Sequence, residues 1–333
     1  GLDLVSGGPP CQPFSIGGKG RGFSDDRDMF NAFAEIVARI KPRAFIIENV
    51  KGLTRAAFAN YLQYIEHRMA MPEIAPKPGE EWPHHLRRLE RELTSTGNKG
   101  VRYNVSRRLY NAADFGAPQK RERVFIVGFR ADQNAHWAFP EPTHSLDALL
   151  RDQWVTGEYW ERHKVSSRDK GAIPSGMASR VERIRRANHV DGMAPWRTVR
   201  DGIVGLPQPR QDGRDTDGTW NHRFQPGARP YPGHTGSPID QPSKALKAGD
   251  HGVPGGENMM VLPDGSCRYF TPREAARMQT FPDGYVLHGA WSEIMRQLGN
   301  AVPVILAQAV ASSVAQQLVQ ASMIAQAKRM RLH

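Results

Sequence analysis

The first fifty residues carry a pattern that restricts the fold class of the chain. A short apolar run at residues 2–5 leads into a Gly/Pro-rich turn, and from Met29 to Ile40 apolar residues recur at helical spacing. Lys41-Pro42 ends that helix, and residues 44–47 form a continuous apolar run. Strand, helix and strand in this order make a βαβ unit, whose two strands run parallel. We therefore expect an α/β protein.

A cysteine stands on the turn after the first of these strands. Cys11 lies in the run Gly-Gly-Pro-Pro-Cys-Gln-Pro-Phe-Ser at residues 7–15. The prolines restrict the backbone on both sides, and the glycines allow a ligand to approach closely. Because ligands of open α/β sheets bind beyond the carboxyl ends of the strands, the run predicts a nucleophile. The alternative is a tight turn that happens to contain a cysteine.

A carboxylate follows the second strand directly. Parallel strands end at the same edge of a sheet, so Cys11 and Glu48 are expected within reach of one ligand. A glutamate in this place is ordinarily the solvated end of a strand, but the shared edge favours a role in proton handling.

Four basic residues near these positions indicate an anionic ligand. Lys19 and Arg21 stand in the glycine-rich segment 17–22, which we interpret as a lid that meets phosphates, with a flexible surface loop as the alternative. Arg121 and Arg123 alternate at the entry of a later strand and are expected to share one face of it. Arginines at a surface strand end are also common without any ligand.

The composition narrows the class of partner. The net charge is +11 and the isoelectric point is near 9.9, which favours a polyanion, and nucleic acid first. Two cysteines exclude a disulfide framework, and the twelve histidines show no metal-ligand spacing. We find no signal peptide and no apolar run of membrane-spanning length, so we expect a cytoplasmic protein without a metal or a membrane partner.

The chain divides by composition into two expected domains. Residues 1–130 and 297–333 form the first, and residues 61–100 within it look like an accessory insertion. Residues 131–296 form a smaller, loop-rich domain with little periodicity apart from the basic stretch Arg180–Arg186.

Several further elements are expected from local signals. Strands are predicted at residues 101–111 and 124–129, and a capping box at Thr271–Glu274 opens a helix. Gly299-Asn300 reads as a turn, and Pro303 starts the last helix.

In this order the pieces resemble the DNA cytosine-5 methyltransferases. The Gly-Gly-Pro-Pro-Cys-Gln-Pro-Phe-Ser run is similar to the nucleophile motif of that family. Other blocks are similar to its Glu-Asn-Val, Gln-x-Arg-x-Arg, Pro-Arg-Glu and Gly-Asn-x-Val motifs; they lie at Phe45–Val50, Asn111–Arg123, Tyr269–Pro282 and Gln297–Pro303. The resemblance implies a Rossmann-like, S-adenosylmethionine-dependent methyltransferase sheet with a target-recognition domain at residues 131–296.

The resemblance also implies a mechanism. Cys11 would attack C6 of a cytosine flipped out of double-stranded DNA, and C5 would then accept the methyl group of S-adenosylmethionine. Glu48 would act at N3, with Asn49 holding the local geometry. Arg123 would hold the O2 atom of the base, and Arg121 would support the loop or a phosphate.

Contacts with the cofactor and with DNA follow from the same resemblance. The implied cofactor contacts are Pro10, Met29, Asn300 and Val302. The implied DNA contacts are Gln12, Ser15, Lys19, Arg21 and Gln119.

Some features depart from the family pattern. Its Phe-x-Gly-x-Gly turn and its ribose-binding acidic residue would precede Gly1, so we expect an incomplete cofactor site and strands missing at the N-terminus. Ala245-Leu246 stands where the family has Thr-Leu. We expect a bacterial modification enzyme in the cytoplasm, associated with the nucleoid. The alternatives are a DNA-binding subunit, whose partner chain supplies the missing motifs, and a tRNA cytosine-5 methyltransferase.

Overall fold

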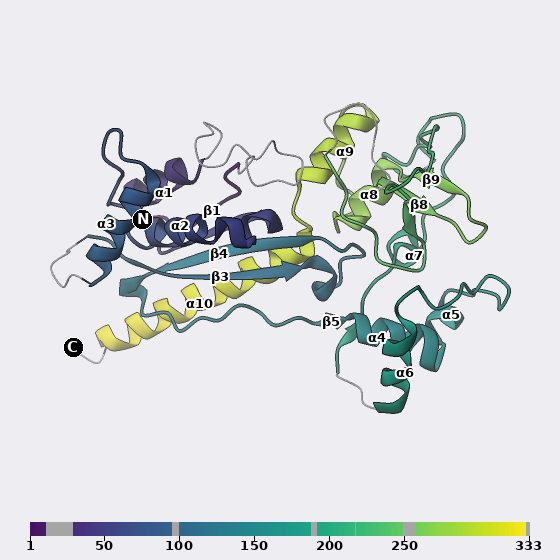
Figure 1. Cartoon of the computed structure of the whole chain (residues 1–333), viewed down its shortest axis with the longest axis horizontal. Coiled ribbons are helices and arrows are strands. Elements are labelled where there is room, and N and C mark those ends of the chain that lie inside the picture. Colours follow the sequence, from purple (N-terminus) through teal and green to yellow (C-terminus); the bar gives the residue numbers. More distant parts are fainter. Residues whose placement is uncertain (11–28, 95–99, 188–191, 217, 249–257, 331–333) are drawn as a thin grey trace. The chain divides into compact units, whose positions relative to one another are not determined.

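The computed structural model describes the chain except for residues 11–28, 95–99, 188–191, 217, 249–257 and 331–333. The chain forms two compact units (Figure 1). Unit 1 comprises residues 1–110, 122–140 and 310–333, and unit 2 comprises residues 111–121 and 141–309.

A four-stranded sheet forms the centre of unit 1. Its strands stand in the order β1 (Leu4–Gly7), β2 (Ala44–Val50), β4 (Glu122–Arg130) and β3 (Tyr103–Asn111). β1 and β2 run parallel, whereas β4 runs antiparallel to β2. The prediction of an α/β fold with a parallel βαβ unit is confirmed, and the sheet as a whole is mixed.

One core cluster of unit 1 contains residues of α1 (Phe30–Ile40), α2 (Ala59–Ala70) and α3 (Trp82–Thr94). α1 buries Phe30, Phe33, Ala34 and Val37, which is the face that its periodicity predicts. α2 differs from the expected accessory insertion, because Tyr61, Leu62, Tyr64, Ile65 and Met69 are all buried in the same core cluster as β2. α2 is therefore part of the core rather than an appendage.

Short elements make up most of unit 2. The helices are α4 (Leu146–Arg151), α5 (Glu158–Arg162), α6 (Ala178–Ala187), α7 (Val199–Ile203), α8 (Pro272–Met278) and α9 (Trp291–Asn300). The strands are β5 (His144–Ser145), β6 (Ala194–Pro195), β7 (Ser237–Pro238), β8 (Met259–Val261) and β9 (Cys267–Tyr269). Short turns of helix occur in both units: η3 (Lys51–Thr54), η4 (Ala56–Phe58) and η6 (Ala131–Gln133) in unit 1, and η5 (Ala112–Phe115) and the π-turn η7 (Asp152–Thr156) in unit 2.

Helix α8 confirms the predicted capping box. The Thr271 side chain accepts from the Glu274 backbone N–H, and the Glu274 carboxylate accepts from the Thr271 backbone N–H at 2.9 Å. Each side chain thus satisfies a backbone donor that the helix leaves unpaired.

The predicted turn at Gly299-Asn300 is wrong, because both residues belong to α9. A Cβ atom on Gly299 would stand 2.3 Å from the backbone nitrogen of Ala248. The glycine therefore serves a close approach between two backbone segments rather than a change of chain direction.

The last helix, α10 (Val304–Met330), is long. The stretch Trp291–Lys328 has the length and composition to cross a membrane, which the sequence analysis missed because Gln and Ser residues interrupt its apolar run. Its side chains Leu306, Val310, Val314 and Leu318 are buried at a spacing of four residues. That spacing is typical of an amphipathic helix packed on a protein core, and a core helix passes the same test of length and composition.

Candidate active site

A carboxylate and a guanidinium pair at the carboxyl end of β2. Nε of Arg123 lies 2.7 Å from Oε1 of Glu48, and the two side chains are only 12% and 19% exposed. Glu48 is on β2 and Arg123 is on the adjacent antiparallel strand β4. Burial lowers the pKa of Arg123 and the Glu48 carboxylate opposes that shift, so the ion pair holds the guanidinium in its charged form.

The backbone beyond β1 fits closely around this pair. A Cβ atom on Gly8 would come within 3.2 Å of Oε2 of Glu48, so the glycine leaves room for the carboxylate. Nδ2 of Asn49 donates to the carbonyl of Pro9 at 3.0 Å, and Asn49 is 6% exposed. Asn49 therefore fastens the segment after β1 to the end of β2.

The chain returns to the same place at the start of α1. The backbone N–H of Met29 donates to the carbonyl of Pro10 at 3.4 Å. A Cβ atom on Gly7 would stand 2.8 Å from the Phe33 ring, so a glycine allows α1 to pack against the end of β1. The predicted cofactor contacts Pro10 and Met29 are thus side by side at the carboxyl end of β1, and both are exposed.

Five predicted residues lie outside the described part of the chain. These are the nucleophile Cys11 and the DNA contacts Gln12, Ser15, Lys19 and Arg21. Cys11 directly follows Pro10 in the sequence.

Arg121 does not lie on β4 with Arg123. It precedes β4, belongs to unit 2 and is 1% exposed. Its guanidinium donates to the carbonyl of Leu246 at 2.9 Å and to the carbonyl of Gly299. The expectation that both arginines share one strand face is wrong. The buried donors of Arg121 meet backbone carbonyls, and its two expected roles stay predictions.

Gln119 is also part of the interior rather than an available DNA contact. It is fully buried, its Nε2 donates to the carbonyl of Met278 at 3.1 Å, and its Oε1 accepts from the backbone N–H of Leu246 at 3.0 Å. Both ends of the amide are therefore used within unit 2, and the predicted DNA contact at Gln119 is wrong in this structure.

Leu246 and the Asn111 side chain have structural roles that the sequence did not predict. Gln119 and Arg121 hold the two backbone polar groups of Leu246, and Oδ1 of Asn111 accepts from the backbone N–H of Arg121 at 3.1 Å. The local signal at Asn111 was its helix-capping preference, because it caps η5. The remaining expected cofactor contacts, Asn300 and Val302, lie at the end of α9 and just before α10 in unit 2.

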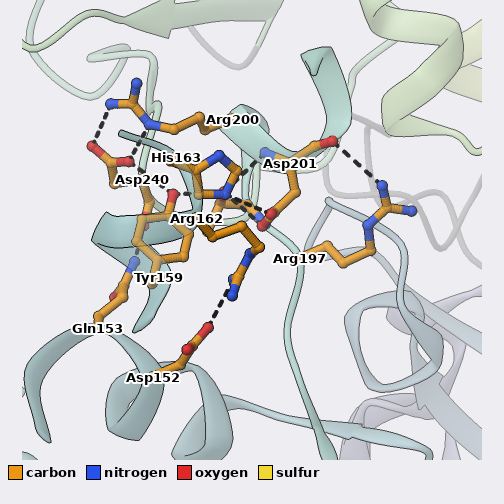
Figure 2. Close-up of polar contacts among 10 residues, drawn as sticks. Asp152, Gln153, Tyr159, Arg162, His163, Arg197, Arg200, Asp201 and Asp240 are labelled. Atoms are coloured by element: carbon orange, nitrogen blue, oxygen red, sulfur yellow. Dashed lines mark hydrogen bonds and ion pairs between the residues drawn. The ribbon is translucent and has the colours of Figure 1, made fainter. Parts of the chain in front are cut away.

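A second polar cluster lies in unit 2 around Tyr159 (Figure 2). The Tyr159 hydroxyl donates to Oδ1 of Asp240 at 2.8 Å, and Arg200 forms two hydrogen bonds to the same carboxylate at 2.6 and 2.9 Å. His163 bonds Asp201 at 2.8 Å. Burial raises the pKa of Tyr159, so its hydroxyl stays protonated as a donor. These mutual contacts join α5 to α7 and indicate a structural role.

Within the described residues, no group of three or more His, Cys, Asp or Glu side chains is placed to hold a metal ion. The described side chains at the carboxyl end of β2 include a carboxylate and a guanidinium, and the backbone beyond β1 leads into Cys11.

Comparisons with known proteins give the relatives of the chain. The family model of the C-5 cytosine-specific DNA methylases matches residues 1–71 and 83–316. The chain is 30% identical over 314 residues to the type II methyltransferase M.AplI of Arthrospira platensis, a match that covers 94% of this chain and 68% of that protein. It is 30% identical over 302 residues to the type II methyltransferase M.NgoFVII of Neisseria gonorrhoeae, covering 90% and 66%.

The chain thus spans about two thirds of the length of these relatives. The crystal structure of the S. pombe Dnmt2 methyltransferase is 16% identical, with a TM-score of 0.47 over 95% of this chain and 79% of that one. With a family model matching nearly the whole sequence, the chain belongs to the C-5 cytosine-specific DNA methylase family.

Proposed function

We propose that the chain is the catalytic and DNA-recognising part of a type II DNA cytosine-5 methyltransferase, acting on a flipped cytosine in a specific sequence. The observation that carries the proposal is the Glu48–Arg123 pair at 2.7 Å, next to the backbone that leads into Cys11. The membership of the chain in its family supports the same reaction.

The pair complements one edge of cytosine. A cytosine presents its O2 and N3 atoms side by side, and both accept hydrogen bonds. Arg123 uses Nε for Glu48 and Nη1 for the carbonyl of Glu122, and a guanidinium has five N–H donors in all. A protonated Glu48 would donate to N3, and Arg123 would donate to O2. The ion pair would keep both groups oriented before the base arrives.

Protonation at N3 makes C6 of the ring susceptible to attack. We propose that the Cys11 thiolate bonds to C6 while the electron pair of the C5–C6 double bond moves to C5. After C5 has accepted a methyl group, loss of the C5 proton and departure of the Cys11 sulfur restore the double bond. Asn49 acts through Pro9, because it fixes the backbone two residues before the nucleophile.

The cofactor side of the site is supported in unit 1 by Pro10 and Met29. Both are exposed and joined by a hydrogen bond at the end of β1, so they are available to a ligand there. S-adenosylmethionine, when bound, supplies the methyl group. Asn300 and Val302 stay proposed cofactor contacts on the strength of the family resemblance alone.

Duplex DNA is the proposed substrate, and the net charge of +11 agrees with a polyanionic partner. A second chain that completes the cofactor site and a cytoplasmic, nucleoid-associated location also remain proposals.

Methylation of DNA tests the function directly. The natural full-length protein would be produced in bacteria without cytosine methylation, and plasmid DNA and tRNA would be digested for detection of 5-methylcytosine by mass spectrometry. We expect 5-methylcytosine in the plasmid at one recurring sequence, and none above background in tRNA. Methylated tRNA with unmethylated plasmid would assign the chain to RNA instead. If neither the plasmid nor the tRNA is methylated, the methyltransferase proposal is wrong.

A further inference from the structure

We propose that the outer face of α6 in unit 2 binds the phosphate backbone of duplex DNA. α6 carries four arginines within ten residues, at positions 180, 183, 185 and 186. The helix packs on its neighbours through Val181 and Ile184, which are 1% and 9% exposed. Its buried face is thus apolar, and the four arginines lie outside that face together with Glu182 and small residues.

The arginines outnumber the carboxylates that they contact. Arg180 and Arg183 share Asp147 of α4, with the Arg183 contact at 3.0 Å. Arg185 and Arg186 share Glu182, at 2.8 and 2.9 Å. Each group of two arginines and one carboxylate therefore has a net charge of +1. Together α4 and α6 hold five arginines and two carboxylates.

Two of these guanidinium groups are well placed for a further partner. The side chains of Arg183 and Arg186 are 65% and 79% exposed, and in their ion pairs each contributes one nitrogen, Nη2 of Arg183 and Nε of Arg186. A guanidinium has five N–H donors in a planar fork that matches phosphate oxygens. The two arginines stand three residues apart on the helix, a rise of about 4.5 Å.

The cavity beside α6 is a weaker candidate for an anion. It has a volume of about 380 Å³. Its charged lining is balanced, with three arginines and three carboxylates: Arg151, Arg162, Arg183, Asp147, Asp152 and Glu158. The positive excess therefore belongs to the outer face of the helix and not to the cavity.

The chemistry of this face favours DNA over a membrane. A helix that lies in a membrane interface needs an exposed apolar face, but the apolar side chains Val181 and Ile184 are already buried in unit 2. DNA offers a regular array of phosphates, about one charge per 3.4 Å along each strand. The inference rests on the proposed function, because it takes the DNA substrate as the partner.

The double variant R183A/R186A tests the inference. It removes the two most exposed arginines and leaves one-to-one pairs, Arg180 with Asp147 and Arg185 with Glu182. Alanine is also the best helix former, so the helix should persist. The matched control is R87A/R91A, which removes two exposed arginines from α3 in unit 1.

Binding of the 333-residue chain to a fluorescent 30-base-pair duplex would be followed by anisotropy between 50 and 200 mM NaCl, with circular dichroism to verify folding. At about 0.1 M salt we expect R183A/R186A to bind roughly 10- to 60-fold more weakly, with a salt slope lower by about 1.8. The control should stay within about two-fold of the wild type.

Three results would overturn the inference. They are an unchanged affinity and salt slope in R183A/R186A, an equal loss in the control, and a loss of binding to phosphatidylglycerol vesicles with DNA binding intact. If the wild type itself fails to bind any duplex, the proposed function fails as well. If the wild type binds DNA and R183A/R186A binds with the same affinity, only the proposed role of α6 is wrong.

Discussion

Replacing Glu48 with glutamine separates the chemical role of the carboxylate from its structural role. Glutamine has almost the same shape, so it should fit beside Gly8 and still accept a hydrogen bond from Arg123. The ion pair becomes a hydrogen bond from the charged guanidinium to a neutral amide oxygen, which costs about 1–3 kcal/mol of folding stability. Glutamine cannot protonate N3, and loss of a general acid lowers turnover by roughly 10²- to 10⁴-fold.

The assay measures single-turnover methylation and urea unfolding on the same preparations. Glu122→Gln is the matched control, because Glu122 neighbours Arg123 but pairs with the exposed Lys51, whose side chain is 57% exposed. We expect this control to stay within about two-fold in rate and about 0.5 kcal/mol in stability. Full turnover in Glu48→Gln, or a rate loss explained by unfolding, would refute the reasoning.

Three further predictions concern stability. Arg121→Met should cost about 2–5 kcal/mol in urea unfolding, because two buried carbonyls lose their donor. Gly299→Ala should cost more than about 2 kcal/mol, because its Cβ would stand 2.3 Å from the Ala248 backbone. Burial lowers the pKa of His85 to about 4, below its unfolded value, so stability should fall by on the order of 1–3 kcal/mol as the pH drops from about 6.5 to 4. His85→Gln should reduce that dependence.

Each of these predictions has a control on the same chain. Gly284→Ala adds a Cβ where no atom lies within 4 Å, so it should be nearly neutral. His84→Gln alters an exposed neighbour of His85 and should leave the pH dependence of stability unchanged. Arg197→Met removes an arginine whose one hydrogen bond in the described structure, at 3.3 Å, is exposed, so its cost should be under about 0.5 kcal/mol. Costs equal to those of the test variants would contradict the packing described here.

The βαβ unit could be predicted because its signals are local. The apolar spacing of α1 matched its buried face, and the apolar run of β2 placed Glu48 at the end of a buried strand. The capping box at Thr271 could be predicted for the same reason, since Thr271 and Glu274 lie within one turn of the helix. Parallel pairing of β1 and β2 then followed from the helix α1 that connects them.

The roles of Arg121, Gln119 and Gly299 depend on contacts that local patterns do not contain. Arg121 donates hydrogen bonds to Leu246 and Gly299, which lie 125 and 178 positions after it in the sequence. Alternation within a strand predicted a shared face for Arg121 and Arg123, but β4 begins only after Arg121. Gly-Asn is an ordinary turn signal, and only the approach of Ala248 shows why a glycine stands inside α9.

The position of the nucleophile is the central claim, and the chain offers an internal control because Cys11 and Cys267 are its two cysteines. The full-length protein would be incubated with S-adenosylmethionine and duplex DNA containing 5-fluorocytosine, which blocks release of the sulfur from C6. Denaturing gels and peptide mass spectrometry would locate the adduct. We predict an adduct on Cys11 in the wild type and in Cys267→Ser, and none in Cys11→Ser. An adduct that persists in Cys11→Ser, or one that maps to Cys267, would contradict the account.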